Sequence, residues 1–287
     1  MLTTATRRAA VLGSPVSHSL SPALHGAAYE ALGLSNWSYD AHEVRAPALL
    51  EFVTGLGPEW AGLSLTMPLK EAAFEVADTV SDQARQVGAI NTLVRRPDGG
   101  WSGDNTDVYG VTQALREAGC AHVASTMVLG SGATARSVVA ALAMLGCQEV
   151  TFAVRSAARP ETVDQARRAG LKVDVVGLGE FADRVGDASV VVSTLPANAL
   201  PERMLPEGSQ LQGHFFLDVV YAGWPTPLAR TFEEAGASVV SGFEMLVHQG
   251  AEQVHLMTGL VAPVEVMRAA GLAAMAAMAS RNAMESP

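Results

Sequence analysis

Runs of apolar, β-favouring residues alternate with stretches of helical periodicity along this chain. In the first third the pattern predicts strands at residues 9–13, 37–43, 60–65 and 90–95, and helices at residues 22–32, 46–54 and 68–78. Strands that alternate with helices are typical of βαβ units, which build parallel sheets. We therefore expect an α/β fold with a mainly parallel sheet in this part of the chain.

A second series of the same kind predicts six more strands, at residues 126–130, 150–154, 172–176, 189–193, 215–219 and 238–240. A helix at 108–118 is expected to link the two series, and the hydrophobic run 243–259 is expected to return to the first. The Ala- and Met-rich tail at 269–283 favours a packing helix. The chain is therefore predicted to form two α/β domains, residues 1–106 plus 244–287 and residues 107–243.

Composition narrows the class of protein. Of the 287 residues 49% are hydrophobic and 17% are charged, and the net charge is -10. No apolar run approaches the roughly 18 to 20 residues of a membrane span, and the run after Arg8 is too short for a signal peptide. The acidic balance argues against nucleic acid, and Cys120 and Cys147 match neither a disulfide framework nor a metal-ligand spacing. We expect a cytoplasmic globular protein without a membrane, nucleic-acid or metal partner.

A glycine-rich segment follows the predicted strand 126–130 and opens a helix predicted at 135–145. It reads Gly130-Ser-Gly132-Ala-Thr-Ala135, a G-x-G-x-x-A pattern. Gly130 permits a tight turn, Gly132 lets a phosphate approach the backbone, and Ala135 allows the helix to pack closely on the strand. The phosphate then lies at the helix N-terminus. A purely structural glycine turn is the alternative, but the strand-turn-helix context favours dinucleotide binding.

The end of the next strand indicates which dinucleotide. NAD enzymes usually place an acidic residue there to bind the ribose 2′-hydroxyl. Here the strand ends in Val154-Arg155-Ser156, and Arg159 follows. Guanidinium groups bind a 2′-phosphate in bidentate fashion, whereas a carboxylate would repel it, so NADP is favoured over NAD. The alternative is a pair of solvated arginines at the start of a helix.

Serines near the N-terminus form a candidate anion site. In Ser17-His-Ser19-Leu-Ser21-Pro22 the hydroxyls alternate, so in an extended segment Ser19 and Ser21 project to one side and could hold one carboxylate. The adjacent helix N-terminus adds backbone donors. For Ser21 helix capping is a strong alternative, because serine before proline is a common helix start.

Lys70 and Asp107 lie in two compact motifs, Thr66-Met-Pro-Leu-Lys70 and Asp104-Asn-Thr-Asp107, upstream of the glycine loop. An amine and a carboxylate beside a dinucleotide site suit the reduction of a carbonyl, in which the cofactor gives the hydride and a side chain gives the proton. The alternative is that both are ordinary surface charges, with Asp107 capping a helix that starts at Val108.

Six motifs, taken in order from about Val11 to Gly259, together resemble the shikimate dehydrogenase family: Ser19-Leu-Ser21-Pro22, Thr66-Met-Pro-Leu-Lys70, Gly88-Ala-Ile-Asn91-Thr, Asp104-Asn-Thr-Asp107, Gly130-Ser-Gly132 and Gly242-Phe-Glu-Met-Leu-Val-His-Gln249. The resemblance implies reversible NADPH-dependent reduction of 3-dehydroshikimate to shikimate, in the biosynthesis of chorismate and aromatic amino acids. It also implies that residues 1–106 plus 244–287 form a catalytic, substrate-binding domain, that residues 107–243 form a Rossmann NADP-binding domain, and that a cleft lies between them.

The resemblance also implies roles for individual residues. Lys70 is expected to transfer the proton and Asp107 to assist it. The substrate is expected to contact Ser19, Ser21, Thr66, Lys70, Asn91, Asp107, Tyr221 and Gln249. The cofactor is expected to contact Gly130, Ser131, Gly132, Ala133, Thr134, Arg155, Ser156, Arg159, Val219, Gly242 and Met245. Asn91 as a turn residue, Gln249 as a helix-surface amide and Tyr221 as a packing residue are the alternatives.

Three positions depart from the family pattern. Ala133 stands where a further glycine is common, Val154 replaces the usual asparagine before the phosphate-binding arginine, and Val108 replaces a glycine. The first two bear on how strictly NADP is preferred. Quinate or an amino-shikimate stays open as the substrate, as does a non-catalytic NADP sensor, because fold does not fix function. The oligomeric state is also open, with a homodimer as one option.

Overall fold

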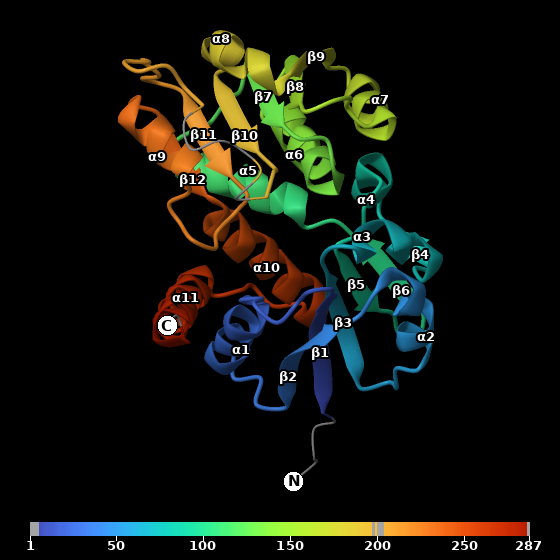
Figure 1. The fold of residues 1–287 in the computed structure, drawn as a ribbon. Coiled ribbons are helices and arrows are strands. Elements are labelled where there is room, and N and C mark those ends of the chain that lie inside the picture. Colours follow the sequence, from blue (N-terminus) through green and yellow to red (C-terminus); the bar gives the residue numbers. More distant parts are fainter. Residues whose placement is uncertain (1–5, 197–198, 200–203, 286–287) are drawn as a thin grey trace. The chain divides into compact units, whose positions relative to one another are not determined.

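The protein is described by a computed structural model, which covers residues 6–196, 199 and 204–285. The chain forms two compact units (Figure 1). Unit 1 consists of Met1–Thr106 and Val247–Pro287, and unit 2 consists of Asp107–Leu246. Within the described residues, each unit contains one six-stranded sheet.

The sheet of unit 1 has the strand order β2-β1-β3-β5-β6-β4. Its strands are β1 (Arg7–Gly13), β2 (Trp37–Glu43), β3 (Trp60–Leu65), β4 (Thr79–Val80), β5 (Thr92–Arg95) and β6 (Trp101–Asp104). β1 is parallel to β2 and β3, as the sequence predicts, and β4 is parallel to β6. β5 runs antiparallel to β3 and β6, so the sheet is mixed. A tight turn at Gly99, with φ +90°, reverses the chain between β5 and β6.

Helices pack against this sheet and against one another. They are α1 (Ser21–Ala31), α2 (Leu49–Thr54), α3 (Leu69–Ala72), α4 (Asp82–Val87) and α11 (Val264–Glu285). α1 and α11 lie side by side (Figure 1). All six residues of β3 are buried, because both faces of this central strand are covered. Leu12, Leu63 and Ile90 are completely buried in the core.

The sheet of unit 2 is entirely parallel, with the order β9-β8-β7-β10-β11-β12. Its strands are β7 (Ser125–Leu129), β8 (Glu149–Val154), β9 (Lys172–Gly177), β10 (Val190–Ser193), β11 (Phe215–Asp218) and β12 (Ser238–Ser241). Counted from β7, this is the doubly wound order 3-2-1-4-5-6, in which ligands bind where the winding reverses, beyond the carboxyl ends of the strands. That switch point lies between β7 and β10.

The helices of unit 2 are α5 (Asp107–Glu117), α6 (Ala133–Met144), α7 (Pro160–Arg168), α8 (Phe181–Arg184) and α9 (Pro227–Glu234). One core cluster contains Phe181, Phe216 and Phe232, and the last two rings stack with their centroids 4.2 Å apart. α10 (Gly242–Thr258) starts in unit 2 and continues into unit 1, since the division between the units falls before Val247.

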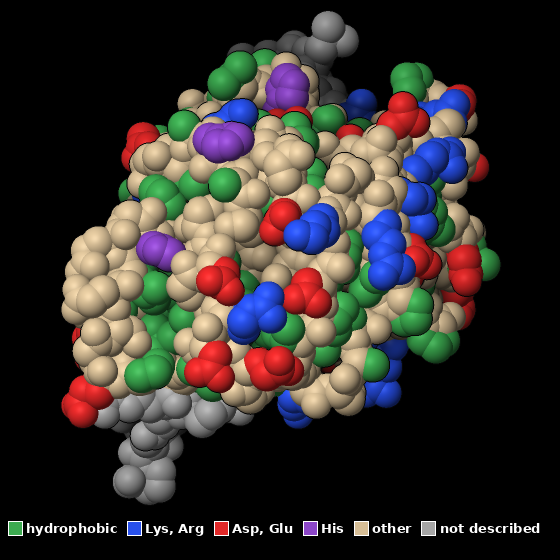
Figure 2. All heavy atoms as spheres, turned by 90° about the horizontal axis from the view of Figure 1, so that it is seen from above, with side chains coloured by type: hydrophobic (Ala, Val, Ile, Leu, Met, Phe, Trp, Pro, Cys, Tyr) green, Lys and Arg blue, Asp and Glu red, His purple; other side chains and the backbone are tan. Residues whose placement is uncertain are grey.

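The face of the molecule in Figure 2 carries charges of both signs, and the two cysteines are buried. Among the residues that the structure describes, none of the helices combines the length and apolarity that crossing a membrane requires. The face shown in Figure 2 mixes acidic side chains with Lys and Arg. Cys120 and Cys147 are buried and unbridged, and burial raises the pKa of both thiols.

Candidate active site

The serine pair lies between β1 and α1. α1 starts at Ser21, but its N-cap position is Leu20 and no side chain makes a capping hydrogen bond. The Ser21 backbone N–H instead donates to Ser19 Oγ over 3.2 Å. Ser21 is buried and Ser19 is half-buried. The capping interpretation of Ser21 is therefore wrong.

The loop that carries Thr66 and Lys70 is tied to its neighbours by the backbone. Thr66 N donates to Leu12 O over 2.9 Å, and a Cβ on Gly13 would lie only 2.3 Å from Thr66 Cγ2. Ile90 N donates to Lys70 O over 2.8 Å. These bonds place the half-buried Lys70, in the first turn of α3, beside the segment that leads to Asn91.

Asn91 is the centre of a buried amide cluster. Its Oδ1 accepts from Thr106 N and from the Thr92 hydroxyl, each over 2.8 Å. Its Nδ2 donates to Thr106 Oγ1 over 3.0 Å and to Gln249 Oε1 over 3.4 Å. Asn91 is 1% exposed and Gln249 is 7% exposed, so neither is a solvated turn residue or a helix-surface amide. Thr106 also joins this cluster, a role that its position in the sequence does not predict.

Asp107 directly follows Thr106 and begins unit 2. It is the first residue of α5, one position earlier than predicted, and it is 4% exposed. Such a carboxylate is favourable at the positive end of a helix dipole. Because it is buried, Asp107 is not the solvated surface charge that the sequence left open. Its chain neighbour is fixed to Asn91, which limits where the carboxylate can lie.

The glycine loop of unit 2 lies at the switch point of the sheet. Gly130 has φ +98°, and a Cβ there would approach Thr194 Oγ1 to 2.7 Å, so the turn requires glycine. Gly132 is extended and precedes α6, and a Cβ there would meet nothing within 4 Å. The space at Gly132 and the N-terminal turn of α6, which begins at Ala133 and Thr134, suit a phosphate.

The end of β8 is connected to this loop. Arg159 N donates to Ser131 Oγ over 3.1 Å, and Thr162 Oγ1 donates to Ser131 O over 2.7 Å. Arg155, Ser156 and Arg159 are all exposed. The sequence assigns these three side chains to a 2′-phosphate. They therefore lie on a segment that is hydrogen-bonded to the glycine loop. Thr162 was not predicted.

The end of β11 forms the third part of the site in unit 2. Val219 and Tyr221 follow this strand and are both half-exposed. Burial raises the pKa of Tyr221, so its phenol stays protonated at neutral pH and can donate to an anion. A Cβ on Gly242 would lie 2.2 Å from Val219 O, which shows how closely α10 approaches this loop. Met245, one turn further along α10, is buried.

Asp218, which belongs to none of the sequence motifs, holds this loop in place. It accepts from Val220 N over 3.1 Å and from the Thr226 hydroxyl over 2.8 Å. Burial raises the pKa of this carboxyl, and the hydrogen bonds oppose the rise. A lone acid at a strand end gives no sequence signal that separates this role from solvation.

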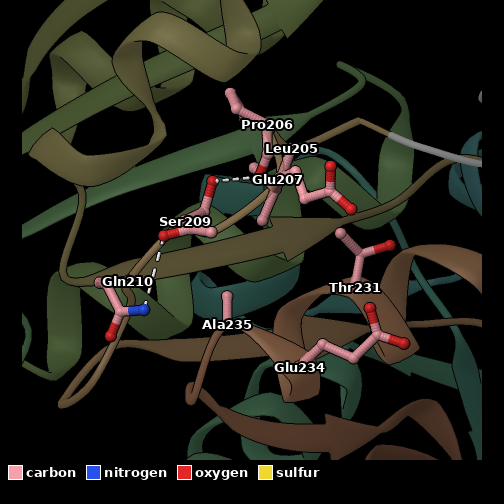
Figure 3. A pocket seen from close by; sticks show the side chains of 9 residues that line it. Leu205, Pro206, Glu207, Ser209, Gln210, Thr231, Glu234 and Ala235 are labelled. Carbon is pink, nitrogen blue, oxygen red and sulfur yellow. Dashed lines mark hydrogen bonds between the residues drawn. The ribbon is translucent and has the colours of Figure 1, made fainter.

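A shallow pocket of unit 2 lies apart from these residues. It is formed by the segment before β11 and by α9 (Figure 3), and its lining includes Glu207, Ser209, Gln210, Thr231 and Glu234. Ser209 Oγ donates to Pro206 O over 2.7 Å. The lining includes none of the predicted site residues, and its two carboxylates do not suit an anionic ligand. This pocket is therefore not the predicted site.

Unit 2 has a doubly wound sheet with a glycine loop at its switch point, and the adjoining part of the chain forms a second α/β unit with buried amides and hydroxyls. Together these features define the class of the protein as a two-domain, dinucleotide-dependent oxidoreductase. Two family models match the chain: the shikimate dehydrogenase substrate binding domain at residues 11–93, and the shikimate 5'-dehydrogenase C-terminal domain at residues 242–270. The chain belongs to the shikimate dehydrogenase family.

Known relatives agree along nearly the whole chain. The shikimate dehydrogenase (NADP(+)) of Methanopyrus kandleri is 39% identical over 91% of this chain and 93% of its own. The structure of a shikimate 5-dehydrogenase from Mycobacterium fortuitum is 46% identical, with a TM-score of 0.82 over 94% of this chain and 99% of that one. A shikimate 5-dehydrogenase from Thermus thermophilus, solved with NADP(H) and shikimate, is 34% identical, with a TM-score of 0.81 over 94% and 100%.

Proposed function

We propose that the protein is an NADP-dependent shikimate dehydrogenase, which reduces 3-dehydroshikimate reversibly to shikimate. One observation carries the proposal. The Lys70 backbone carbonyl accepts a hydrogen bond from Ile90 N. The next residue, Asn91, forms a buried amide cluster with Gln249. This cluster lies beside the chain segment that leads into Asp107. A binding protein without catalysis has no need of a proton-transferring amine next to such a cluster.

In this proposal unit 1 binds the substrate. Ser19 and Ser21 take the carboxylate, with the phenol of Tyr221 as a further donor. Thr66, Asn91 and Gln249 hold the ring hydroxyls, because amide and hydroxyl groups both donate and accept. These polar side chains are largely buried, so a substrate that leaves them without partners is rejected. We assign this role to residues 1–106 plus 244–287, boundaries that differ from those of unit 1 by three residues in α10.

Unit 2 fits NADP. The open space at Gly132 admits a diphosphate to the start of α6, with Gly130, Ser131, Ala133 and Thr134 as the surrounding loop. Arg155, Ser156 and Arg159 are exposed and take the 2′-phosphate. Val219, Gly242 and Met245 line the nicotinamide half. Ala133 and Val154 remove no charged contact, so they soften the preference for NADP without reversing it.

Bound NADPH supplies the hydride that reduces the ring carbonyl. As negative charge develops on the carbonyl oxygen, the Lys70 ammonium donates a proton to it, and in the oxidation of shikimate the Lys70 amine takes the proton back. Asp107 accepts a hydrogen bond from the lysine and from the neighbouring hydroxyl, which fixes their geometry. Partial burial of Lys70 limits the competition from water for this proton.

Two other functions are open to test. Quinate or amino-shikimate oxidation would use the same chemistry, but the serine pair and the arginines favour shikimate and NADP. A non-catalytic NADP sensor would keep unit 2 and dispense with the proton-transferring group. Lys70 and Asp107 are both retained, which favours an enzyme.

A four-way assay tests the proposal. Purified protein is given shikimate or quinate, each with NADP or NAD, and reduction of the nucleotide is followed by absorbance. The largest kcat/KM is expected for shikimate with NADP. Preference for quinate with NAD would replace the substrate and cofactor assignments, and tight NADP binding without turnover on either acid would favour the sensor.

A further inference from the structure

The segment that joins β8 to α7 is hydrogen-bonded to the glycine loop at Ser131, which lies between the two glycines. This segment carries the three side chains assigned above to the 2′-phosphate, Arg155, Ser156 and Arg159, and all three are exposed. One bond to Ser131 comes from the backbone N–H of Arg159, and the other comes from the side chain of Thr162 in α7. We call these two bonds the loop clamp.

Each bond of the loop clamp has only one possible direction. The Arg159 backbone N–H can only donate, so Ser131 Oγ accepts it, over 3.1 Å. The Ser131 carbonyl can only accept, so the Thr162 hydroxyl donates to it, over 2.7 Å. Thr162 is completely buried, so its bond is protected from water. Thr162 therefore holds the backbone of Ser131, and the side chain of Ser131 holds Arg159.

The Ser131 hydroxyl keeps its own hydrogen in this arrangement. It accepts from Arg159 N with an oxygen lone pair, which leaves the O–H group to donate to another acceptor. A hydroxyl that accepts one hydrogen bond is polarised and donates more strongly. Ser131 is half-buried and directly precedes Gly132, where an added Cβ would meet nothing within 4 Å. A phosphate oxygen of the cofactor is therefore a suitable acceptor for this hydroxyl.

The glycine loop has anchors that do not depend on the loop clamp. Gly130 N donates to Ala153 O over 3.1 Å, which ties the start of the loop to β8. Arg136 N donates to Gly132 O over 3.2 Å, which ties the end of the loop to α6. Neither bond involves Ser131, so the loop should keep most of its shape when the loop clamp is removed.

The segment that carries the arginines is less firmly held. Residues 155–159 form neither helix nor strand, and the side chains of Arg155, Ser156 and Arg159 are exposed, so packing does little to fix them. The bond from Arg159 N to Ser131 sets the distance of this segment from the loop. Loss of the loop clamp should therefore loosen the 2′-phosphate ligands more than the diphosphate ligands.

We infer that the loop clamp sets how strongly NADP is preferred over NAD, because it holds Arg159 beside the glycine loop before the cofactor binds. Thr162 is a positioning residue, which acts through Ser131. Preorganised ligands reduce the entropy cost of binding. NAD has no 2′-phosphate and gains nothing from the placement of Arg159. The inference rests on the proposed function, since it takes the exposed arginines as ligands of the 2′-phosphate.

Thr162→Val tests the loop clamp with little change of side-chain size. The Kd for NADP should rise about fivefold, the scale of one hydrogen bond, while the Kd for NAD should stay within about twofold of wild type. Adenosine 2′,5′-bisphosphate carries the 2′-phosphate without the nicotinamide, so it should lose as much affinity as NADP does. A merely structural role of Thr162 would not separate the three ligands in this way.

Ser131→Ala removes the other half of the loop clamp at a partly exposed position of the loop. It deletes both the acceptor of the Arg159 N–H and the hydroxyl that suits a phosphate, so the Kd for NADP should rise about tenfold. In this background Thr162→Val should add less than about twofold, because the Arg159 bond that Thr162 supports is already absent.

Thr126→Val is the matched control. Thr126 is also buried, and its hydroxyl also donates to a backbone carbonyl, Val190 O, over 2.9 Å. It lies near the start of β7, whereas the glycine loop follows the end of that strand. This variant should lose about as much Tm as Thr162→Val and should leave the Kd values for NADP and NAD unchanged.

The experiment is calorimetric titration of NADP, NAD and adenosine 2′,5′-bisphosphate into wild-type protein and each variant, with thermal unfolding in parallel. A selective loss of affinity for the two 2′-phosphate ligands in Thr162→Val, with no further loss in the Ser131→Ala background, would support the inference. Equal losses for NADP and NAD, or wild-type Kd values in both single variants, would overturn it. Failure of the proposed function would show in the wild-type protein itself, as equal affinity for NADP and NAD, and would remove both.

Discussion

The approach of α10 to the loop after β11 makes Gly242→Ala a severe test of the unit 2 site. The added Cβ would lie 2.2 Å from Val219 O, 2.3 Å from Val219 C and 2.8 Å from Asp218 O. All three are backbone atoms, so no rotamer change relieves the contact. An ordinary carbon-oxygen contact is more than about 3 Å, so the helix start and the loop must separate by about 1 Å. Overpacking of this kind costs about 1 to 3 kcal/mol.

The consequence should appear in both stability and cofactor binding. For a domain of this size, a loss of about 1 to 3 kcal/mol in the free energy of unfolding corresponds to a fall in Tm of roughly 2 to 12 °C. The loop and helix that separate carry Val219 and Met245, so NADP affinity should fall as well. The assay is thermal unfolding with and without NADP, and the variant should also gain less Tm from the cofactor than wild type does.

Gly250→Ala is the matched control. It makes the same change in the same helix, but the nearest atom to its Cβ would be Met267 Cε at 3.5 Å, an ordinary contact. Alanine also has the better helix propensity, by about 0.8 to 1.0 kcal/mol, so this variant should be at least as stable as wild type. If Gly242→Ala unfolds at the wild-type temperature, or if both variants lose the same Tm, the reasoning from the Val219 contact is refuted.

Two further predictions concern the cofactor phosphate and a buried acid. Arg155→Ala should raise the Kd for NADP by about tenfold, because it removes one charge-assisted hydrogen bond whose contribution is reduced by exposure to solvent, and it should leave the Kd for NAD unchanged. The control is Arg168→Ala, which removes another exposed arginine. An equal change in Kd for both nucleotides in Arg155→Ala would contradict the 2′-phosphate assignment. Burial raises the pKa of Asp218 in the folded chain, so its contribution to stability is full below the unfolded pKa of about 3.9 and declines as the pH rises towards the folded pKa. The Tm of Asp218→Asn relative to wild type should therefore increase as the pH is raised from about 4, and a difference that does not change with pH would contradict this.

Much of the fold was accessible from sequence because the main elements carry strong local signals. The expected strands at 37–43 and 60–65 match β2 and β3, and the helix expected at 22–32 is α1, one residue earlier. The antiparallel course of β5 was not predicted. β6 follows β5 closely through a turn at Gly99, and β4 has only two residues, which is too short for a periodicity.

The site was predictable from sequence only where a short local motif indicates the role of its residues. The glycine loop did so, because Gly130 has a positive φ and Gly132 has open space around it. The Ser21 capping alternative failed because serine before proline has the same pattern whether or not its hydroxyl caps the helix. Gln253 lies one helical turn beyond Gln249, a spacing that does point to a shared face, but its partners come from β3 and β5 and have no sequence signal.

The central claim is that Lys70 moves the proton in an NADP-linked oxidation of shikimate. Its most direct test is the turnover of shikimate with saturating NADP by wild-type protein and by Lys70→Ala, with NADP affinity measured in parallel. Wild-type protein should turn over, and the variant should lose about 10² to 10⁴ in kcat, the usual contribution of a general acid-base group, while it binds NADP normally. Unchanged turnover in Lys70→Ala would contradict the account.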